Sequence, residues 1–136
     1  MDFLKSIAIA ASGLRAQSGR MRVIAENVAN ADSTPSKPGE APYRRKIPTF
    51  KSHYDHELGA STLALGQVKR DSAAFKLKYE PGHPLANANG YVQKPNVDTM
   101  IETLDMREAQ RSYEANLNVI STTRRMLSRT LDILRA

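Results

Sequence analysis

The 136-residue sequence contains no cysteine and no tryptophan, and it has only three phenylalanines and five tyrosines. Without a thiol the chain forms neither disulfides nor a cysteine nucleophile, so thiolate chemistry is excluded. The lack of cysteine does not fix a compartment, but it suits a protein that crosses an oxidising space as a single unlinked chain.

Long apolar runs are also missing. No stretch approaches the roughly 20 apolar residues that a membrane-spanning helix needs, so we expect no direct membrane insertion. Ala8–Ala10 resembles the cleavage box of a secretory signal, but Lys5 interrupts the apolar run and leaves only residues 7–11. We therefore expect that a route out of the cytoplasm, if the protein takes one, does not cleave its N-terminus.

The net charge of +6 is not gathered in a tail or on one helix. Residues 1–35 carry four basic and three acidic groups, and residues 97–136 carry six of each, so +5 falls between them. Nucleic-acid-binding proteins cluster their basic residues on one face or in one arm. The distribution therefore predicts no nucleic-acid partner.

His53, Asp55 and His56 are the closest approach to a metal-binding set. A zinc site takes three or four ligands with a supporting shell, and the remaining histidine, His83, falls in a predicted turn. The sequence therefore predicts solvated loop histidines, no metal and no cofactor.

Catalytic motifs are absent as well. No glycine-rich phosphate loop follows a predicted strand, and no serine has a G-x-S-x-G context. Glu102, Asp105 and Glu108 share one face of a predicted helix, but Arg107 and Arg111 lie three or four residues from several of them. We interpret this group as a solvated ion-pair face, and we expect no catalytic residue and no enzymatic activity.

Proline is distributed so that both ends of the chain can be helical. All seven prolines lie between Pro35 and Pro95, and no glycine follows Pro95. We expect an N-terminal helix in residues 1–32, a loop-rich middle with short strands in 33–95 and a C-terminal helix in 96–136. The predicted fold is mainly α: two long terminal helices packed as an antiparallel coiled-coil-like pair, with a small irregular β element in the middle.

Both predicted helices carry apolar residues at seven-residue steps, which is typical of helices that pack lengthwise. In the first helix they are Ile7, Leu14, Met21 and Val28, with Ile24 beside them. In the second they are Met106, Tyr113, Ile120, Leu127 and Leu134, with Leu117 and Leu131 between them. Helices of roughly 40 and 55 Å cannot bury such rows inside a small globule, so we predict that these residues form an assembly seam with other chains.

Two glycines, Gly13 and Gly19, fall inside the first predicted helix. Each costs up to about 1 kcal/mol relative to alanine in a helix interior. Either packing holds this helix in place, or the glycines allow a partner to approach closely.

The middle segment has strand signals of unequal quality. Phe75–Tyr79 alternates apolar and basic residues, and Tyr43–Phe50 and Leu63–Val68 are weaker candidates. We expect one small element of two or three strands, and an exposed loop at Ser33–Pro42.

Three residues are candidates to cap the second helix: Asn96, Asp98 and Thr99. Thr99 with Glu102 also has the spacing of a capping box. In either arrangement the helix is expected to begin near residue 98.

Several short motifs occur in a fixed order along the chain. They are Ser12–Gln17 with Ala25–Ala31, Tyr79–Pro84 with Gly90–Val92, and Pro95–Asp98 with Arg111–Asn116. Together they resemble flagellar basal-body rod proteins of the FlgC family, and the first motif resembles flagellar axial proteins more broadly. The motif residues are Asn27, Asn30, Pro81, Gly82, His83, Pro84, Gly90, Tyr91, Pro95, Asn96, Tyr113 and Asn116.

The resemblance implies a structural subunit of the proximal rod, which crosses the periplasm and is exported by the flagellar type III apparatus. The implied partners are other rod proteins and the inner-membrane ring or its adaptor, and the implied role is to transmit torque through self- and hetero-assembly of the terminal helices. On this view Asn27 and Asn30 bond backbone groups where the chain leaves the first helix, and Gly82 supplies a permissive dihedral in a stiff turn. A helical adaptor or interaction module outside the flagellum is the alternative.

Overall fold

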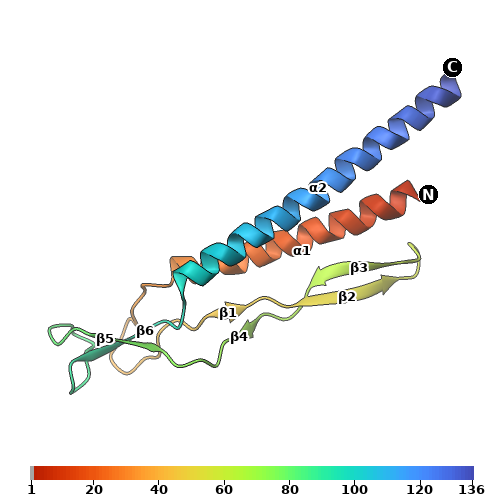
Figure 1. The fold of residues 1–136 in the computed structure, drawn as a ribbon. Coiled ribbons are helices and arrows are strands. Elements are labelled where there is room, and N and C mark those ends of the chain that lie inside the picture. Colours follow the sequence, from red (N-terminus) through yellow and green to blue (C-terminus); the bar gives the residue numbers. More distant parts are fainter. Residues whose placement is uncertain (1) are drawn as a thin grey trace. The chain divides into compact units, whose positions relative to one another are not determined.

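The computed structural model describes residues 2–136 and contains two long helices separated by short strands (Figure 1). Helix α1 spans Phe3–Ala29 and helix α2 spans Thr99–Arg135. The prediction of two terminal helices with small strands between them is confirmed. The helices hold just under half of the residues, so the description as mainly α applies to the ends of the chain and not to its middle.

The chain forms two compact units, and each helix contributes to both. Unit 1 comprises the chain up to Met21 together with Pro48–Gln67 and Arg107–Ala136. Unit 2 comprises Arg22–Ile47 and Val68–Met106.

The strands of residues 2–136 form three separate antiparallel pairs, and not the one small element that the sequence predicted. The pairs are β1 (Lys46–Ile47) with β4 (Lys69–Arg70), β2 (Phe50–Asp55) with β3 (Ala60–Leu65), and β5 (Lys76–Tyr79) with β6 (Tyr91–Lys94). The strand predicted at Phe75–Tyr79 is confirmed as β5.

Strand β2, which with β3 is one of the two longest strands, was missed because its sequence shows no apolar alternation and its side chains are mostly exposed. It contains His53, so this residue lies in a strand and not in the predicted loop. The carboxylate of Asp55 accepts the N–H groups of Glu57 and Leu58 at 3.0 and 3.1 Å, which fixes the turn into β3.

Small residues of α1 contact β3 and α2 closely within unit 1. The Ser12 hydroxyl accepts the N–H of Leu63 in β3 at 3.1 Å and donates to the Ile9 carbonyl at 2.6 Å. A Cβ on Gly13 would lie 2.7 Å from the Asn116 side chain, and one on Gly19 would lie 2.9 Å from Leu65. Both glycines therefore allow close contact with segments of the same chain.

Unit 2 has a small core of buried side chains that includes Ile24, Val92 and Val97. Asp98 caps α2, because its carboxylate accepts the N–H groups of Met100 and Ile101 at 2.9 and 3.4 Å. The capping box considered for Thr99 and Glu102 does not form, since the Glu102 side chain bonds elsewhere. The Ser33–Pro42 segment contains neither helix nor strand, and most of it is exposed apart from buried Pro42.

Candidate assembly surface

The residues predicted as an assembly seam have unequal exposure in the structure. Ile24 is buried; Ile7, Leu14, Met21, Met106, Tyr113, Ile120 and Leu127 are half-buried; Val28, Leu117, Leu131 and Leu134 are exposed. The exposed members concentrate towards the C-terminal end of α2, where the side chains of Leu131 and Leu134 are 49% and 76% exposed.

A different row of α2 faces inward, and sequence reasoning missed it. Ala109, Asn116 and Thr123 follow a seven-residue step, and Ala109 is fully buried while Thr123 is only 7% exposed. Asn116 lies against Gly13 of α1 and donates from its side chain to the Ser112 carbonyl at 2.9 Å. Because small and polar side chains occupy this row, the larger apolar side chains of α2 point elsewhere.

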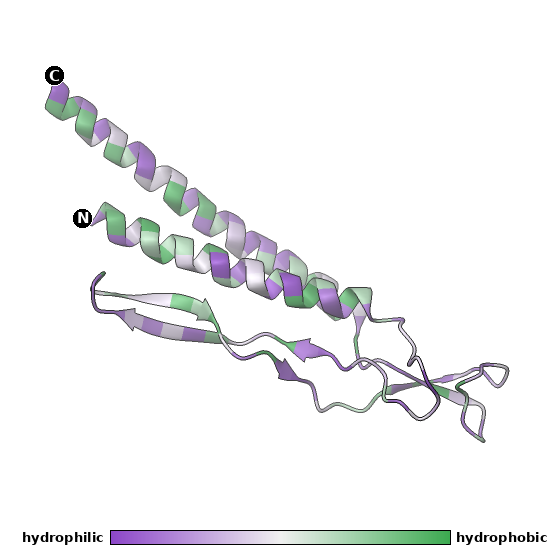
Figure 2. Ribbon diagram, turned by 180° about the vertical axis from the view of Figure 1, so that it is seen from behind, coloured by the Kyte–Doolittle hydropathy of each residue, from purple (hydrophilic) through white to green (hydrophobic). Residues whose placement is uncertain are grey.

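Large apolar residues remain on the surface of α2 along its whole length. Figure 2 shows apolar bands recurring along the helix up to its C-terminal end. The exposed ones are Met100, Ile101, Leu104, Leu117, Val119, Met126, Leu131, Ile133 and Leu134. Ile133 is 75% exposed, and side chains of this size are seldom left in water in such number along one helix without a partner.

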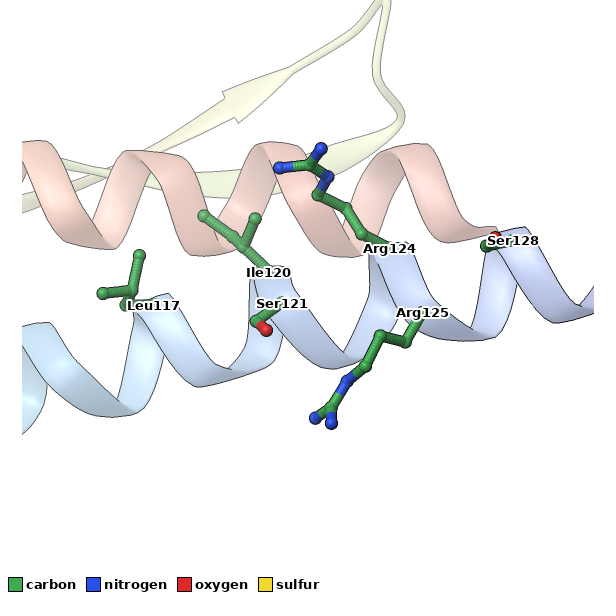
Figure 3. A pocket seen from close by; sticks show the side chains of 6 residues that line it. All are labelled: Leu117, Ile120, Ser121, Arg124, Arg125 and Ser128. Atoms are coloured by element: carbon green, nitrogen blue, oxygen red, sulfur yellow. The ribbon is translucent and has the colours of Figure 1, made fainter.

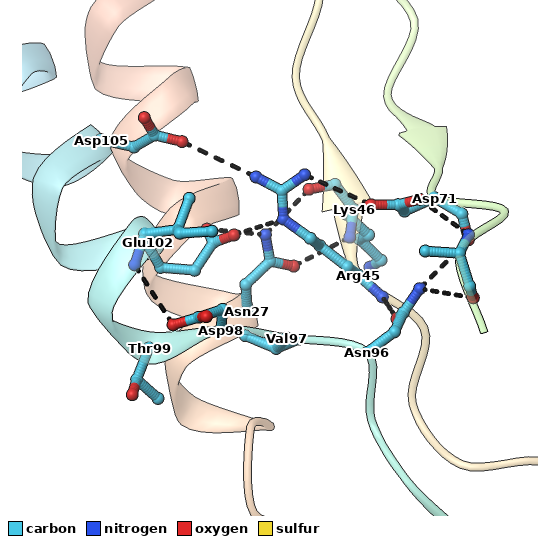
Figure 4. Close-up of polar contacts among 12 residues, drawn as sticks. Asn27, Arg45, Lys46, Asp71, Asn96, Val97, Asp98, Thr99, Glu102 and Asp105 are labelled. Atoms are coloured by element: carbon cyan, nitrogen blue, oxygen red, sulfur yellow. Dashed lines mark hydrogen bonds and ion pairs between the residues drawn. The ribbon is translucent and has the colours of Figure 1, made fainter. Parts of the chain in front are cut away.

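A polar cluster in unit 2 joins the end of α1 to the start of α2 (Figure 4). Asn27 is fully buried, and its amide donates to the Lys46 carbonyl at 2.8 Å and to Glu102 at 3.0 Å. Its oxygen accepts the Lys46 N–H and the Tyr43 hydroxyl, both at 2.9 Å. Asn27 therefore bonds one residue of β1 as a neighbouring strand would, and holds that residue against the helix.

Asn30 plays a smaller part. Its amide donates to the Glu26 carbonyl at 2.8 Å within the last turn of α1, and its side chain is half-buried. The prediction that both asparagines bond backbone groups where the chain leaves α1 is thus confirmed for Asn30, whereas Asn27 bonds the backbone of Lys46 in β1.

Arg45 is the second centre of the cluster. Its guanidinium donates a hydrogen bond to Glu102 and lies 3.4 Å from Asp71 and 3.7 Å from Asp105. Burial alone lowers the pKa of Arg45, but the hydrogen bond and charge of Glu102, followed by those of Asp71, outweigh it and raise this pKa. Glu102 is 1% exposed, so its pairing with Arg45 and Asn27 is what permits a carboxylate here.

The interpretation of the α2 acids as a solvated ion-pair face was wrong for Glu102, which is buried, while Glu108 is exposed and forms an ion pair. Glu102 and Asp105 bind Arg45, and Glu108 lies 3.5 Å from Arg20 of α1. Their partners are distant in sequence, which a count of helical spacing cannot reveal.

Tyr43 borders the cluster with its hydroxyl directed at Asn27. Burial raises its pKa to about 12, and the charges of Glu26 and Glu102 add to this effect. Lys46 also forms an ion pair with Glu26 on α1.

The Pro95–Asp98 motif gains a structural role from this cluster. Pro95 and Val97 are buried, and the Asn96 side chain accepts the Arg45 N–H at 2.7 Å and donates to the Ala73 carbonyl at 3.1 Å. With Asp98 as the helix cap, consecutive residues fix the point at which the chain enters α2.

The Pro81–Pro84 motif forms the predicted turn, and the nitrogen Nδ1 of His83 accepts the Leu85 N–H at 3.1 Å. Gly82 does not adopt a positive φ, so the permissive dihedral expected there was misplaced. Gly90 adopts it instead, with φ of 82°, and a Cβ there would lie 2.9 Å from the ring of Tyr79. That ring makes an edge-on contact with Tyr91 at 5.3 Å between centroids.

Residues 2–136 contain no group of three or more histidine, cysteine or acidic side chains placed to hold a metal ion. No helix in this part of the chain combines the length and hydropathy that crossing a bilayer requires. A groove on α2 is lined by Leu117, Ile120, Ser121, Arg124, Arg125 and Ser128 (Figure 3).

Comparison with known proteins identifies the family of this chain. A family model described as flagella basal body rod protein matches residues 7–35, and one described as flagellar basal body rod FlgEFG protein C-terminal matches residues 88–133. The chain is 49% identical over 128 residues to a relative from Agrobacterium fabrum, covering 94% of this chain and 92% of that one. It is 42% identical over 133 residues to a Salmonella typhimurium relative, covering 98% of each, and 39% identical over 148 residues to one from Bacillus subtilis, covering 98% and 99%.

All three relatives are named flagellar basal-body rod protein FlgC, which agrees with the prediction of a structural protein and not an enzyme. Identity at this level over nearly the full length of both chains shows that the chain belongs to the FlgC family of flagellar basal-body rod proteins.

Proposed function

We propose that this chain is a structural subunit of the proximal rod of the flagellar basal body, and that it assembles with copies of itself and with other rod proteins through its terminal helices. The family supports the assignment to a rod. The inner-membrane ring or its adaptor is the further partner, the flagellar type III apparatus exports the chain, and the periplasm is its location. The absence of cysteine suits passage through that compartment.

The observation that carries the assembly mechanism is the exposure of large apolar residues along α2. The row facing α1 is filled by small and polar side chains, so folding of one chain leaves Leu117, Leu131 and Leu134 in water. Contacts that repeat from subunit to subunit without closing a ring build a helical tube, and such contacts cover these residues.

Contacts between the helices support an antiparallel, coiled-coil-like pairing. Within unit 1, Gly13 lies against Asn116 and Arg20 pairs with Glu108, while within unit 2 Asn27 bonds Glu102. Partners of α2 thus move towards its N-terminus as α1 advances. On this proposal residues 1–32 and 96–136 form the rod core, and 33–95 lie outside it.

Torque is then borne by many packed side chains acting together, since each pair of atoms contributes only about 0.1–0.2 kcal/mol of dispersion energy. The polar cluster around Asn27 and Arg45 keeps the ends of the two helices in register with strand β1 while load is applied. The predicted seam is the surface over which this load passes between neighbouring subunits.

The test is to place a charge on the seam. Leu117→Asp and Ile120→Asp are each expected to abolish rod assembly and motility in a strain that lacks its own copy of the gene, while export of the chain remains normal. Ala115→Asp is the matched control, because it adds the same charge at an exposed position of α2 that lies off the seam. A motile strain carrying Leu117→Asp or Ile120→Asp would refute the packing role.

A further inference from the structure

Positive charge gathers at the C-terminal end of α2 without acidic compensation. Residues 117–136 contain one acid, Asp132, and four basic residues, Arg124, Arg125, Arg129 and Arg135. None of these arginines forms an ion pair with an acidic side chain of residues 2–136. The helix dipole favours a cation only in the last turn, where Arg135 lies, so it does not account for the others.

Two of these arginines border the groove on α2. Arg124 and Arg125 extend from the helix in opposite directions, and Leu117 and Ile120 lie on the turns before them (Figure 3). Leu117 is 48% exposed. The groove therefore combines two apolar side chains and two serines with two arginines that extend in different directions. Charges beside an apolar row select helix partners in coiled coils.

The terminal helices of a second copy supply little of the complementary charge. Helix α1 carries four basic side chains and a single acidic one, Glu26. In α2 the acids Glu102, Asp105 and Glu108 are already paired within the chain, which leaves Glu114 and Asp132 on a helix that carries six arginines. Like charges brought together across an interface disfavour that pairing.

We propose that this groove binds an amphipathic helix of a different protein, whose apolar stripe is flanked by glutamate or aspartate. The inference rests on the proposed function, in which α2 packs against neighbouring chains. It adds that the neighbour at the C-terminal half of α2 is heterologous and acidic.

Binding of two synthetic helices to the purified full-length chain tests this. Both helices carry the same leucine and isoleucine stripe, flanked by glutamate in one and by lysine in the other, and binding is followed by fluorescence anisotropy. The glutamate helix is expected to bind about tenfold more tightly, and the difference should shrink as salt is added. Equal affinities of the two helices would overturn the proposal.

Charge reversal locates the effect. The double variant Arg124→Glu, Arg125→Glu is expected to reverse the preference. The control Arg107→Glu, Arg111→Glu makes the same change in net charge at exposed positions of the same helix and should keep the preference. If both double variants behave alike, net charge and not the groove governs binding, and the proposal fails. Circular dichroism of each variant confirms that the helices are intact.

Two further outcomes separate this inference from the proposed function. Self-association of the wild-type chain that the Arg124→Glu, Arg125→Glu variant abolishes would assign the groove to a second copy. Normal incorporation of that variant into purified basal bodies would overturn the inference and leave the rod assignment standing. Absence of the wild-type chain from those basal bodies would overturn the rod assignment itself.

Discussion

Replacing Asn27 by alanine removes the side chain that connects α1, β1 and the start of α2 within unit 2. The change leaves the N–H and carbonyl of Lys46 without their partner and takes one hydrogen bond from the Tyr43 hydroxyl and one from Glu102. A buried polar group left without a partner costs about 1–3 kcal/mol. Tyr43 is half-buried and Glu102 keeps Arg45, so the two backbone groups dominate and the expected loss is about 3 kcal/mol.

Urea denaturation followed by far-ultraviolet circular dichroism measures this loss in the free energy of unfolding, and the melting temperature should fall by about 10 °C. Asn30→Ala is the matched control, because the Asn30 side chain donates a single hydrogen bond, to the Glu26 carbonyl of α1. Its expected loss is about 0.5 kcal/mol. If Asn27→Ala costs no more than Asn30→Ala, the cluster does not hold unit 2 together.

Three further changes test other parts of the structure. Gly90→Ala is expected to lower the free energy of unfolding in urea by about 2 kcal/mol, because φ at Gly90 is +82° and a Cβ would lie 2.9 Å from a tyrosine ring. Gly82→Ala should be nearly neutral. Similar losses at both positions would contradict this. Gly13→Ala is expected to lower the free energy of unfolding by about 1 kcal/mol, because the new Cβ would collide with the Asn116 side chain. Adding Asn116→Ala should remove this loss, since alanine favours a helix over glycine by about 1 kcal/mol. A double-mutant cycle that shows no coupling would argue against close packing of the two helices. Folding raises the pKa of Tyr43 from 10.0 to about 12, so the contribution of Tyr43 to stability is complete below pH 10 and is lost as pH rises towards 12. An absorbance titration of tyrosinate should show a step near pH 12 that the Tyr43→Phe variant lacks. A titration that Tyr43→Phe leaves unchanged would refute the assignment.

The helices could be predicted from the sequence because the signals that define them are local. Proline is confined to the middle of the chain, and apolar residues recur at seven-residue steps at both ends. The family could be recognised because its motifs consist of consecutive residues. The strand at β5 was visible for the same reason, since its residues alternate in character.

The packing partners could not be predicted, because they depend on contacts between distant residues. Asn27 and Glu102 are 75 positions apart, and Arg45 and Glu102 are 57 apart. Nothing in the spacing of Glu102 indicated that it would be buried beside an arginine of the middle segment. The inward row of α2 could not be predicted either, because alanine and threonine are common at exposed helix positions. Ala109 and Thr123 are buried in the structure, where α1 approaches this face of α2 at Gly13.

We propose that the apolar faces of the terminal helices are covered between molecules. Hydrogen exchange of the α2 backbone measures this most directly, in the purified chain at low concentration and in isolated basal bodies. We predict that residues 124–135 exchange rapidly in the free chain, because their exposed apolar side chains lack partners, and that the same amides become strongly protected in the assembled rod. Full protection of both terminal helices in the dilute free chain would contradict the account.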